Sequence, residues 1–487
     1  MPDLSKRGPV VLDYPKYSYQ FSEFFGIGDN GNLWCDGCDV DALADEFGTP
    51  LHVFSENQFR HNYRRFRDAF QAHYPDVKIL FANKSNNGLA MRHIMNQEGA
   101  GGDCFGHNEM YIALLAGTDP KALVLNGSNK EADEIELAVT NGVCINIDAM
   151  DEVDVIHETA NRLGRDIEVG IRAKLELPAL EDRFGRGVHS GSMAEIVWGE
   201  KWGMPYEQTV ELVKRIRSQM NNLHPVELHF HLSRLDNQAK DFAEMAREMV
   251  QWCAHLRDDT GWTPPAIDLG GGWTFGRKEK TGALGGVDDE TVSSFENYGA
   301  EVASAVKDEC AKHGLGLPTL KIEPGRSISG MAGIAVGRVG AVKTWAKKNH
   351  KWVNVDLSGN HVPWISIPHH YHIVAANKAS APATETVDIV GPICTHDVLG
   401  HAREMPELVR GDTVALLDTG CYAESTSANF NAQCRPATVL VCGADAEVVT
   451  ERERLEDVMG RFRIPSRLIA QSYGDALSGA IPPSLTS

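Results

Sequence analysis

The sequence predicts an α/β protein that combines a (β/α)8 barrel with a second, β-rich domain. Three observations lead to this fold class. Between residues 48 and 330, short apolar runs alternate with amphipathic stretches, which is the pattern of parallel strands joined by helices. Beyond residue 330, β-branched runs follow one another without long helical patterns. At 487 residues, the chain is also too long for one ordinary core.

The first part contains eight or so strand–helix units over about 280 residues, which fits a closed barrel better than an open sheet. The expected strands are His52–Ser55, Lys78–Ala82, Gly102–Phe105, Ala122–Leu125, Cys144–Asp148, Ile167–Ala173, Val226–His231, Ala266–Leu269 and Thr319–Glu323. Helical patterns lie between them, for example Lys130–Thr140, Asp151–Leu163, Tyr206–Met220, Gln238–Leu256 and Phe295–His313. We therefore assign residues 48–330 to the barrel.

Residues 331–487, together with the irregular arm 1–47, are expected to form the β-rich domain. Its predicted strands are Gly333–Lys343, Trp352–Asp356, Thr386–Val390, Thr413–Leu417 and Ala437–Val441. One charged stretch, Ala446–Met459, has a helical pattern, and the Pro/Ser-rich end is expected to be loose.

Composition excludes several classes of function. The formal net charge is −20, which argues against nucleic acid or an acidic membrane as partner. No apolar run is long enough to cross a bilayer, and the first residues lack the apolar segment of a signal peptide. Ten scattered cysteines are typical of a cytoplasmic protein with free thiols. The one CxxC, Cys35–Cys38, lacks the further ligands of a zinc site, so no metal is predicted.

Polar residues gather where the predicted barrel strands end, which is where such barrels carry their active sites. Lys84 follows the strand-like run Val77–Ala82, and a desolvated lysine there is suited to Schiff-base chemistry. Taken alone, this lysine could simply extend into solvent. The other polar strand ends include Asp103, Asn126, Asp148, Arg172, His229, His231, Arg234, the triplet Gly270–Gly272 and Glu323-Pro-Gly-Arg326.

The chemistry of this set is coherent. The glycine triplet can present backbone N–H groups to a phosphate, and Arg326 adds a cation. Glu323 ends a buried strand and needs a partner, which a protonated ring nitrogen would supply. His231 can stack on a flat ring. Together with Lys84, these residues describe a site for pyridoxal 5'-phosphate (PLP).

The chain resembles the fold-type III PLP enzymes, in particular the diaminopimelate and ornithine decarboxylase group, which share a barrel with alanine racemases. The resemblance runs from about Gly48 to Val441. The matching segments are Phe81-Ala-Asn-Lys84-Ser-Asn, Gly102-Asp103-Cys-Phe-Gly-His-Asn-Glu109, Asn126-Gly-Ser-Asn-Lys130-Glu, His229-Phe-His231, Leu269-Gly-Gly-Gly272, Glu323-Pro-Gly-Arg326, Gly391-Pro-Ile-Cys394-Thr-His-Asp397 and Asp418-Thr-Gly-Cys-Tyr422.

The resemblance implies a role for each matching residue. Lys84 is the Schiff-base lysine, and Cys394 returns a proton to Cα after carbon dioxide leaves. The cofactor-binding residues are Lys84, Asp103, His231, Arg234, Gly270, Gly271, Gly272, Glu323, Gly325, Arg326 and Tyr422. In this family the loop Cys394–Asp397 comes from the second subunit. A homodimer with active sites at its interface is therefore implied. In this family the N-terminal arm joins the β-rich domain.

Several positions depart from the pattern of diaminopimelate decarboxylases. Thr395 replaces a carboxylate that holds the distal amine, and Ile367 replaces an arginine in the segment that ends at Tyr371. Ser233-Arg234 replaces a Gly-Ser, and Arg183-Phe-Gly185 replaces a Lys-Phe-Gly. Losing a charged contact costs enough to redirect specificity.

We therefore expect a decarboxylase of an amino acid or amino-acid conjugate, with diaminopimelate itself doubtful, of the kind recruited to specialised metabolism. The candidate substrate-binding residues are Arg326, Tyr371, Thr395 and Asp397, and His369, His370 and His396 could contact a polar substrate tail. Two alternatives stay open. One is another PLP reaction, such as racemisation with Tyr422 or Tyr371 as second base, β-elimination, or C–N or C–C bond formation. The other is an inactive regulatory homologue.

Overall fold

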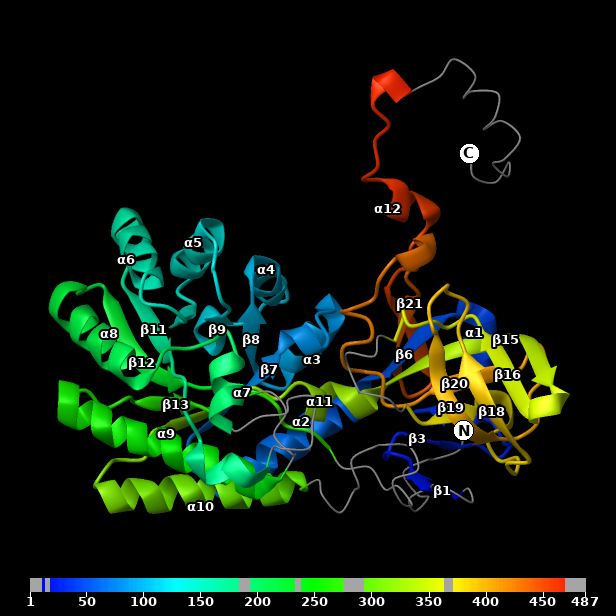
Figure 1. Ribbon diagram of the computed structural model, residues 1–487, viewed down its shortest axis with the longest axis horizontal. Coiled ribbons are helices and arrows are strands. Elements are labelled where there is room, and N and C mark those ends of the chain that lie inside the picture. The colour runs from blue at the N-terminus through cyan, green and yellow to red at the C-terminus, as the bar shows by residue number, and fades with distance from the viewer. Residues whose placement is uncertain are drawn as a thin grey trace.

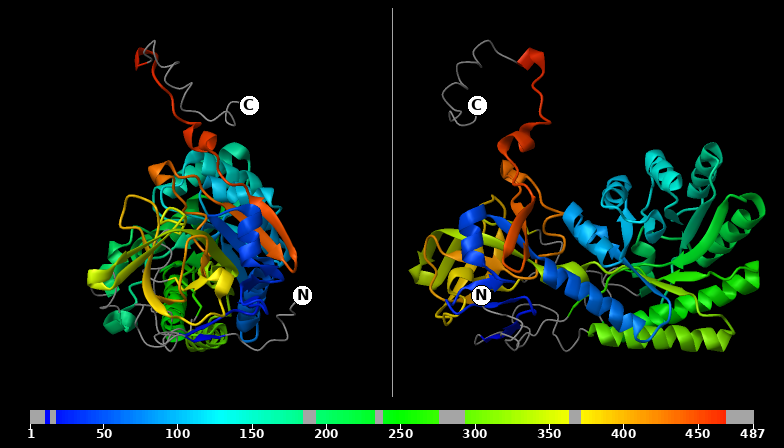
Figure 2. Two further views of the ribbon diagram at one scale, coloured as in Figure 1. Left: turned by 90° about the vertical axis from the view of Figure 1, so that its right-hand side faces the viewer. Right: turned by 180° about the vertical axis from the view of Figure 1, so that it is seen from behind.

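The structure is a computed structural model that describes residues 11–13, 18–183, 193–232, 238–275, 293–362 and 371–468. A barrel surrounded by helices lies beside a body made mostly of β-sheet, and the C-terminal segment rises away from both (Figure 1). The same arrangement is seen from the side and from behind in Figure 2. Among the described residues, no helix has the length and apolar character needed to cross a membrane.

Eight parallel strands close the barrel in the order β10-β11-β12-β13-β14-β7-β8-β9. This confirms the predicted fold class. The barrel strands are β7 (Val77–Ala82), β8 (Gly101–Phe105), β9 (Leu123–Asn126), β10 (Cys144–Ile147), β11 (Ile167–Arg172), β12 (Leu223–His229), β13 (Ala266–Asp268) and β14 (Thr319–Ile322).

The helices of the barrel region have amphipathic sequences. In α2, Phe59, Tyr63, Phe66 and Phe70 recur on one face and are fully buried, and Ser55 caps the first turn by accepting the N–H of Gln58 at 3.0 Å. The helices are α2 (Glu56–Gln71), α3 (Leu89–Gln97), α4 (His107–Leu115), α5 (Ala132–Asn141), α6 (Glu152–Leu163), α7 (Met193–Gly199), α8 (Tyr206–Gln219), α9 (Ala239–Thr260), α10 (Phe295–His313) and the short α11 (Arg326–Ser329).

The second body is built on a nine-stranded sheet. Seven strands follow the order β19-β18-β16-β15-β6-β21-β22, and β20 pairs with both β15 and β17. The strands are β6 (Leu51–Ser55), β15 (Gly333–Trp345), β16 (His350–Val355), β17 (Ile373–Ala375), β18 (Glu385–Val390), β19 (Val398–Met405), β20 (Thr413–Leu416), β21 (Ala437–Cys442) and β22 (Asp445–Thr450).

The N-terminal segment packs on this sheet. Phe21, Phe25 and Leu33 share a buried cluster with Val336 and Val439 of β15 and β21. The remaining elements are β1 (Val11–Asp13), β2 (Ser18–Gln20), β3 (Phe25–Ile27), β4 (Leu33–Cys35), β5 (Cys38–Asp39) and α1 (Val40–Phe47). All ten cysteines are free, as expected, and Cys35 and Cys38 face each other across the β4–β5 turn.

Two predicted elements were wrong. The strand at residues 52–55 is not a barrel strand, because β6 pairs with β15 and β21 of the other sheet. All five residues of β6 are buried, so its apolar run looks the same in either environment. The stretch 446–459 is not one helix. It forms β22, which pairs with β21, and then the short helix α12 (Leu455–Met459).

The two bodies meet at the carboxyl ends of the barrel strands. The loop that follows β20 reaches the turn after β7, where the Tyr422 N–H donates to the Ser85 carbonyl at 2.7 Å. The Ser425 hydroxyl donates to the Lys84 carbonyl at 2.9 Å. Residues far apart in sequence are thereby held around Lys84.

Candidate active site

Lys84 lies in a short 3-10 turn, Asn83–Ser85, directly after β7. Its Nζ is 2.5 Å from Oδ2 of Asp103, a fully buried residue of β8. Burial alone would lower the pKa of the lysine, but the charge of Asp103, with Tyr422 and Glu323, raises it above its usual value. In this state the amine is a protonated cation paired with a carboxylate.

Asn126, at the end of β9, links the Lys84 pair to Glu323. Its Nδ2 donates to Asp103 Oδ1 at 2.8 Å and to Glu323 Oε1 at 2.7 Å. Its Oδ1 in turn accepts a hydrogen bond from Asn146 Nδ2 at 2.9 Å. One amide therefore satisfies an oxygen on each of two buried carboxylates.

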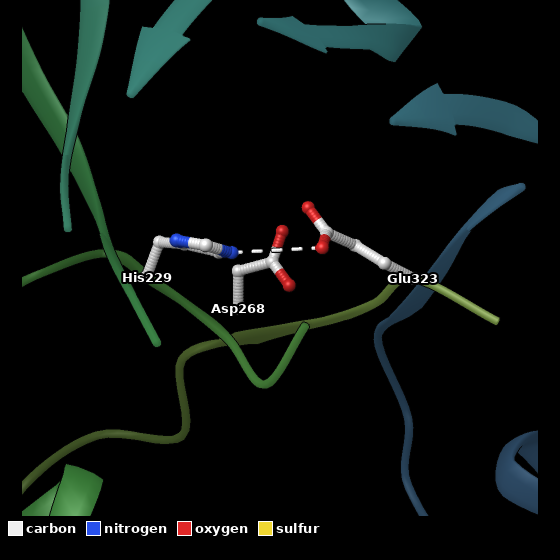
Figure 3. A group of neighbouring side chains, drawn as sticks. All are labelled: His229, Asp268 and Glu323. Carbon is white, nitrogen blue, oxygen red and sulfur yellow. Dashed lines mark ion pairs between the residues drawn. The ribbon is translucent and has the colours of Figure 1, made fainter. Parts of the chain in front are cut away.

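Glu323 follows β14 and is 1% exposed. Its Oε2 lies 3.5 Å from His229 Nε2 and 3.7 Å from His231 Nδ1. Asp268, at the end of β13, is the third member of this buried group (Figure 3). Burial opposes ionisation of Glu323, but His229 and Lys84 outweigh it and hold its pKa well below the usual range.

The glycine triplet passes beneath His231. Gly270 and Gly272 have φ angles of +62° and +94°, which strongly favour glycine. A Cβ on Gly270 would lie 2.7 Å from His231 Cβ, and one on Gly271 would lie 2.8 Å from His231 Cε1. The triplet is thus a cradle that any side chain would fill.

Two of the three glycine N–H groups are already used within the site. Gly270 donates to Asp268 Oδ1 and Gly271 donates to His231 Nδ1, both at 2.8 Å. The second bond makes Nδ1 an acceptor, which agrees with burial lowering the pKa of His231 and keeping the ring neutral. Of the three glycine amides, that of Gly272 alone donates to no group among the described residues and is left for an external anion.

Arg326 and Tyr422 come together although they belong to different bodies. The guanidinium of Arg326 lies over the Tyr422 ring, 5.3 Å from its centroid. Gly325 lies against the turn that carries Lys84, since a Cβ there would be 2.9 Å from Ser85 Cβ. The structure therefore assembles eight predicted cofactor residues with Lys84, while Arg234 lies outside the described residues. The eight are Asp103, His231, Gly270, Gly271, Glu323, Gly325, Arg326 and Tyr422.

The segment that carries Cys394 belongs to the second body. The Cys394 side chain is exposed, with Sγ 3.3 Å from Asn431 Nδ2. Asp397 is buried, and its two carboxylate oxygens accept the N–H groups of Gly359 at 2.7 Å and Ile393 at 3.2 Å. Within one subunit Asp397 thus shapes its own loop, whereas Thr395 is exposed.

The structure says less about how the other candidate residues would contact a substrate. Tyr371 is buried in an apolar cluster of the second body. Ile367, His369 and His370 lie outside the described residues, and His396 is exposed.

Sequence reasoning gave no role to Asn126, Asn146, His229 or Asp268. Two of them, Asn126 and His229, are among the polar strand ends named in the sequence analysis. A polar side chain at the end of a buried barrel strand is the signal that could have found them.

The residues suit PLP in three physical respects. Lys84 supplies an amine for the aldehyde, and Glu323 is an ionised, buried carboxylate whose charge suits a protonated ring nitrogen. The glycine cradle leaves space for a group that no side chain could share. A barrel with this constellation at its strand ends defines a fold-type III PLP enzyme.

Comparison with known proteins agrees with this class of enzyme. The family described as pyridoxal-dependent decarboxylase, pyridoxal binding domain, matches residues 56–330. The diaminopimelate decarboxylase of Methanothermobacter thermautotrophicus is 30% identical over 448 residues, covering 91% of this chain and 98% of that protein. The enzyme of that name from Archaeoglobus fulgidus is 30% identical over 450 residues, covering 90% and 99%. The chain belongs to the pyridoxal-dependent decarboxylase family.

Solved structures show the same likeness. The crystal structure of diaminopimelate decarboxylase from M. jannaschii gives a TM-score of 0.81 at 26% identity and covers 92% of this chain and 99% of that one. Its co-complex with L-lysine gives a TM-score of 0.81 at 27% identity, covering 91% and 99%. The protein is thus a PLP-dependent carboxy-lyase acting on an amino acid. The similar proteins do not support the expectation that diaminopimelate is doubtful as substrate.

Proposed function

We propose that the decarboxylation site is centred on Lys84 and Glu323, with Asp103 and Asn126 connecting them. The observation that carries this proposal is the continuous set of short contacts from Lys84 Nζ through Asp103 and Asn126 to Glu323 Oε1. It fixes an amine and an ionised carboxylate on neighbouring strands of a rigid barrel. Such preorganisation costs no rearrangement when substrate binds.

Each residue has a role that follows from its chemistry. When bound, PLP supplies an electron sink for the carbanion left by decarboxylation. Glu323 holds a proton on the ring nitrogen, and the neutral ring of His231 offers a flat face. The amide of Gly272, the guanidinium of Arg326 and the hydroxyl of Tyr422 are the proposed phosphate donors, and Arg326 is also a candidate partner for the substrate carboxylate.

For the proton returned to Cα, we propose the Cys394 thiol of a second subunit. The exposed position of Cys394 on the second body supports this assignment, because a side chain that faces solvent in one subunit is available to its partner. The proposal implies a homodimer. Asp397 then acts by holding the Cys394 loop in shape through Gly359 and Ile393.

For the substrate, we propose an amino acid whose distal end lacks the charges of diaminopimelate. Thr395 supports this, because it stands in the Cys394 loop where the resembling decarboxylases have a carboxylate for the distal amine. A neutral hydroxyl cannot replace that charge, and a lost charged contact weakens binding by about 10-fold or more. The similar proteins are diaminopimelate decarboxylases, which favours diaminopimelate itself as substrate. Turnover of diaminopimelate and of other amino acids must therefore be compared directly.

The test is to incubate the purified protein with PLP and a panel of amino acids that includes meso-diaminopimelate, with product masses read by mass spectrometry. We expect a product lighter by one carbon dioxide, and no product from Lys84→Ala. Turnover of diaminopimelate above all others would contradict the substrate proposal alone. Products of another mass would contradict decarboxylation at this site.

A further inference from the structure

The barrel interior beneath Glu323 is polar and closed to solvent. Glu227 and His229 of β12 and Asp268 of β13 are fully buried, and Lys321 of β14 lies beside them. Asp268 and Lys321 are direct neighbours across the β13–β14 pair. Buried ionisable groups of this density are costly unless their charges are matched.

Asp268 lies beside the ion pair of His229 and Glu323 (Figure 3). One nitrogen or oxygen from each of these three side chains lies within 4.8 Å of the others. Asp268 Oδ1 accepts the N–H of Gly270 at 2.8 Å, while Oδ2 has no hydrogen-bond partner among the described residues. Two carboxyl groups thus lie together in a buried site beside the imidazole of His229.

The nearby cations are already committed to other carboxylates. The Lys321 ammonium is in close contact with Glu227 Oε2, and Lys84 is paired with Asp103. Two carboxylates so close together in a dry site cannot both keep their charge, so the pair holds one proton.

Burial, reinforced by Glu323 and Glu227, raises the pKa of Asp268 well above its usual value, whereas that of Glu323 is lowered. The charged or titratable groups around the pair are His229, His231, Glu227, Lys321, Lys84, Asp103, Arg172 and Cys144. Glu323 also accepts a hydrogen bond from Asn126 and lies 3.5 Å from His229, whereas Asp268 accepts only the N–H of Gly270 among the described residues, so the proton belongs to Asp268.

We propose that Asp268 is a neutral positioning residue: it carries the proton of the buried pair, anchors the glycine triplet through Gly270, and leaves the negative charge on Glu323. This deepens the proposed function, because it rests on the role of Glu323 toward the ring nitrogen. It also joins the two ends of the cofactor site. The same carboxyl group fixes the backbone that forms the phosphate cradle and sets the charge at the ring nitrogen.

The proton can be observed without substrate by infrared spectroscopy. We expect a protonated-carboxyl stretch at neutral pH that shifts when the unmutated protein is labelled with [4-13C]aspartate and disappears in Asp268→Asn. The exposed Asp166→Asn is the control, because Asp166 lies outside the buried group and its loss should remove no such band. Absence of an aspartate band in the labelled, unmutated protein would overturn the proposal even where a variant fails to fold.

A second readout is the pH titration of the visible absorbance of the PLP-loaded protein. Asp268→Asn should leave its midpoint unchanged, because an amide replaces a neutral acid. Glu323→Gln removes the negative charge that the proposal leaves on Glu323 and should lower the midpoint by about half a pH unit or more. Asp268→Ala loses the acceptor for Gly270 and should weaken PLP binding about 10-fold, with rescue by asparagine.

Two results would contradict the predictions made for the PLP-loaded protein. A midpoint that moves as far in Asp268→Asn as in Glu323→Gln would mean that Asp268 is ionised. A stoichiometric divalent cation in the purified protein would have the same meaning, because it would hold both carboxyls charged. Failure of decarboxylation with the aspartate band intact would refute the proposed function and leave the protonation of Asp268 standing.

Discussion

Asn126 shows how one uncharged residue makes a charged site stable. Its amide donates to Asp103 and Glu323 together, so two carboxylates are tolerated side by side in the barrel. Both are 1% exposed, and no water can replace the lost donor without entering the core. The residue belongs to the site although it need not touch a substrate.

Replacing Asn126 with leucine is therefore expected to destabilise the protein by about 3 kcal/mol, because it leaves two buried carboxylate oxygens without a donor. Urea unfolding followed by circular dichroism measures this difference. The exposed Asn108→Ala on α4 is the control and should change the free energy of unfolding by less than about 0.5 kcal/mol. Equal changes in the free energy of unfolding in the two variants would show that Asn126 does not stabilise the two buried carboxylates.

Glu109, on α4, is predicted to make the stability of the folded protein depend on pH. Burial, with a contribution from Asp103, raises its pKa from 4.5 to about 7. Between these values the folded protein binds more protons than the unfolded chain, so this group lowers stability as pH rises, and its full cost is reached above pH 7.

Glu109→Gln removes this cost. The variant should match the parent near pH 4 and exceed its free energy of unfolding by about 3 kcal/mol near pH 8. Urea unfolding at several pH values measures this, with the exposed Glu158→Gln as control. A difference between variant and parent that does not grow with pH would refute the assignment.

At the scale of elements, β11 shows why the polar interior fits inside the barrel. The register between β11 and β12 shifts at Val169/Gly170, and Gly170 faces the polar layer. A Cβ on Gly170 would lie 1.7 Å from Asn146 Oδ1 and 2.7 Å from Glu227 Cγ. The missing side chain gives these two residues their space.

Gly170→Ala should therefore cost about 3 kcal/mol or more, since neither neighbour has an alternative position in a closed barrel. Gly316→Ala is a matched control, because no atom lies within 4 Å of the added Cβ. Thermal unfolding of both variants compares the two sites. A Gly170 variant as stable as the Gly316 variant would mean that the interior can rearrange.

At the scale of the whole molecule, the barrel and the second body share one site. The loop after β20 brings Tyr422 onto the Lys84 turn, and Arg326 leads from the barrel into α11. We propose that the domain boundary lies at the end of β6, near residue 56, with residues 56–330 as the barrel. The N-terminal arm, β6 and residues 331–487 then form the second domain.

The proposed homodimer makes a prediction about mixtures. If Lys84 and Cys394 in one site come from different subunits, refolding an equal mixture of Lys84→Ala and Cys394→Ala should restore about a quarter of the parental activity. Half the dimers are then mixed, and each has one intact site of two. Sedimentation measures the dimer, and each variant alone is the control. Activity no greater than the sum of the separate variants would place both residues in one subunit.

Much of the site could be predicted because the topology of a barrel determines where the strand ends lie. Periodic apolar runs indicate parallel strands, and their carboxyl ends must meet at one rim. Lys84, Asp103, His231, Glu323 and the glycine triplet could therefore be grouped by their position after strands alone. The strand at residues 52–55 could not be placed, because a short buried run carries no information about which sheet it joins.

The sequence by itself determined the barrel, the β-rich second part and the residues at the strand ends, because these follow from local periodicity and a fixed topology. Only the tertiary structure decided which groups are in contact. It placed Asn126 between two carboxylates, committed the Gly270 and Gly271 amides to Asp268 and His231, and brought Tyr422 to Lys84. Such contacts depend on distances of a few tenths of an ångström between residues far apart in sequence, which no local pattern records.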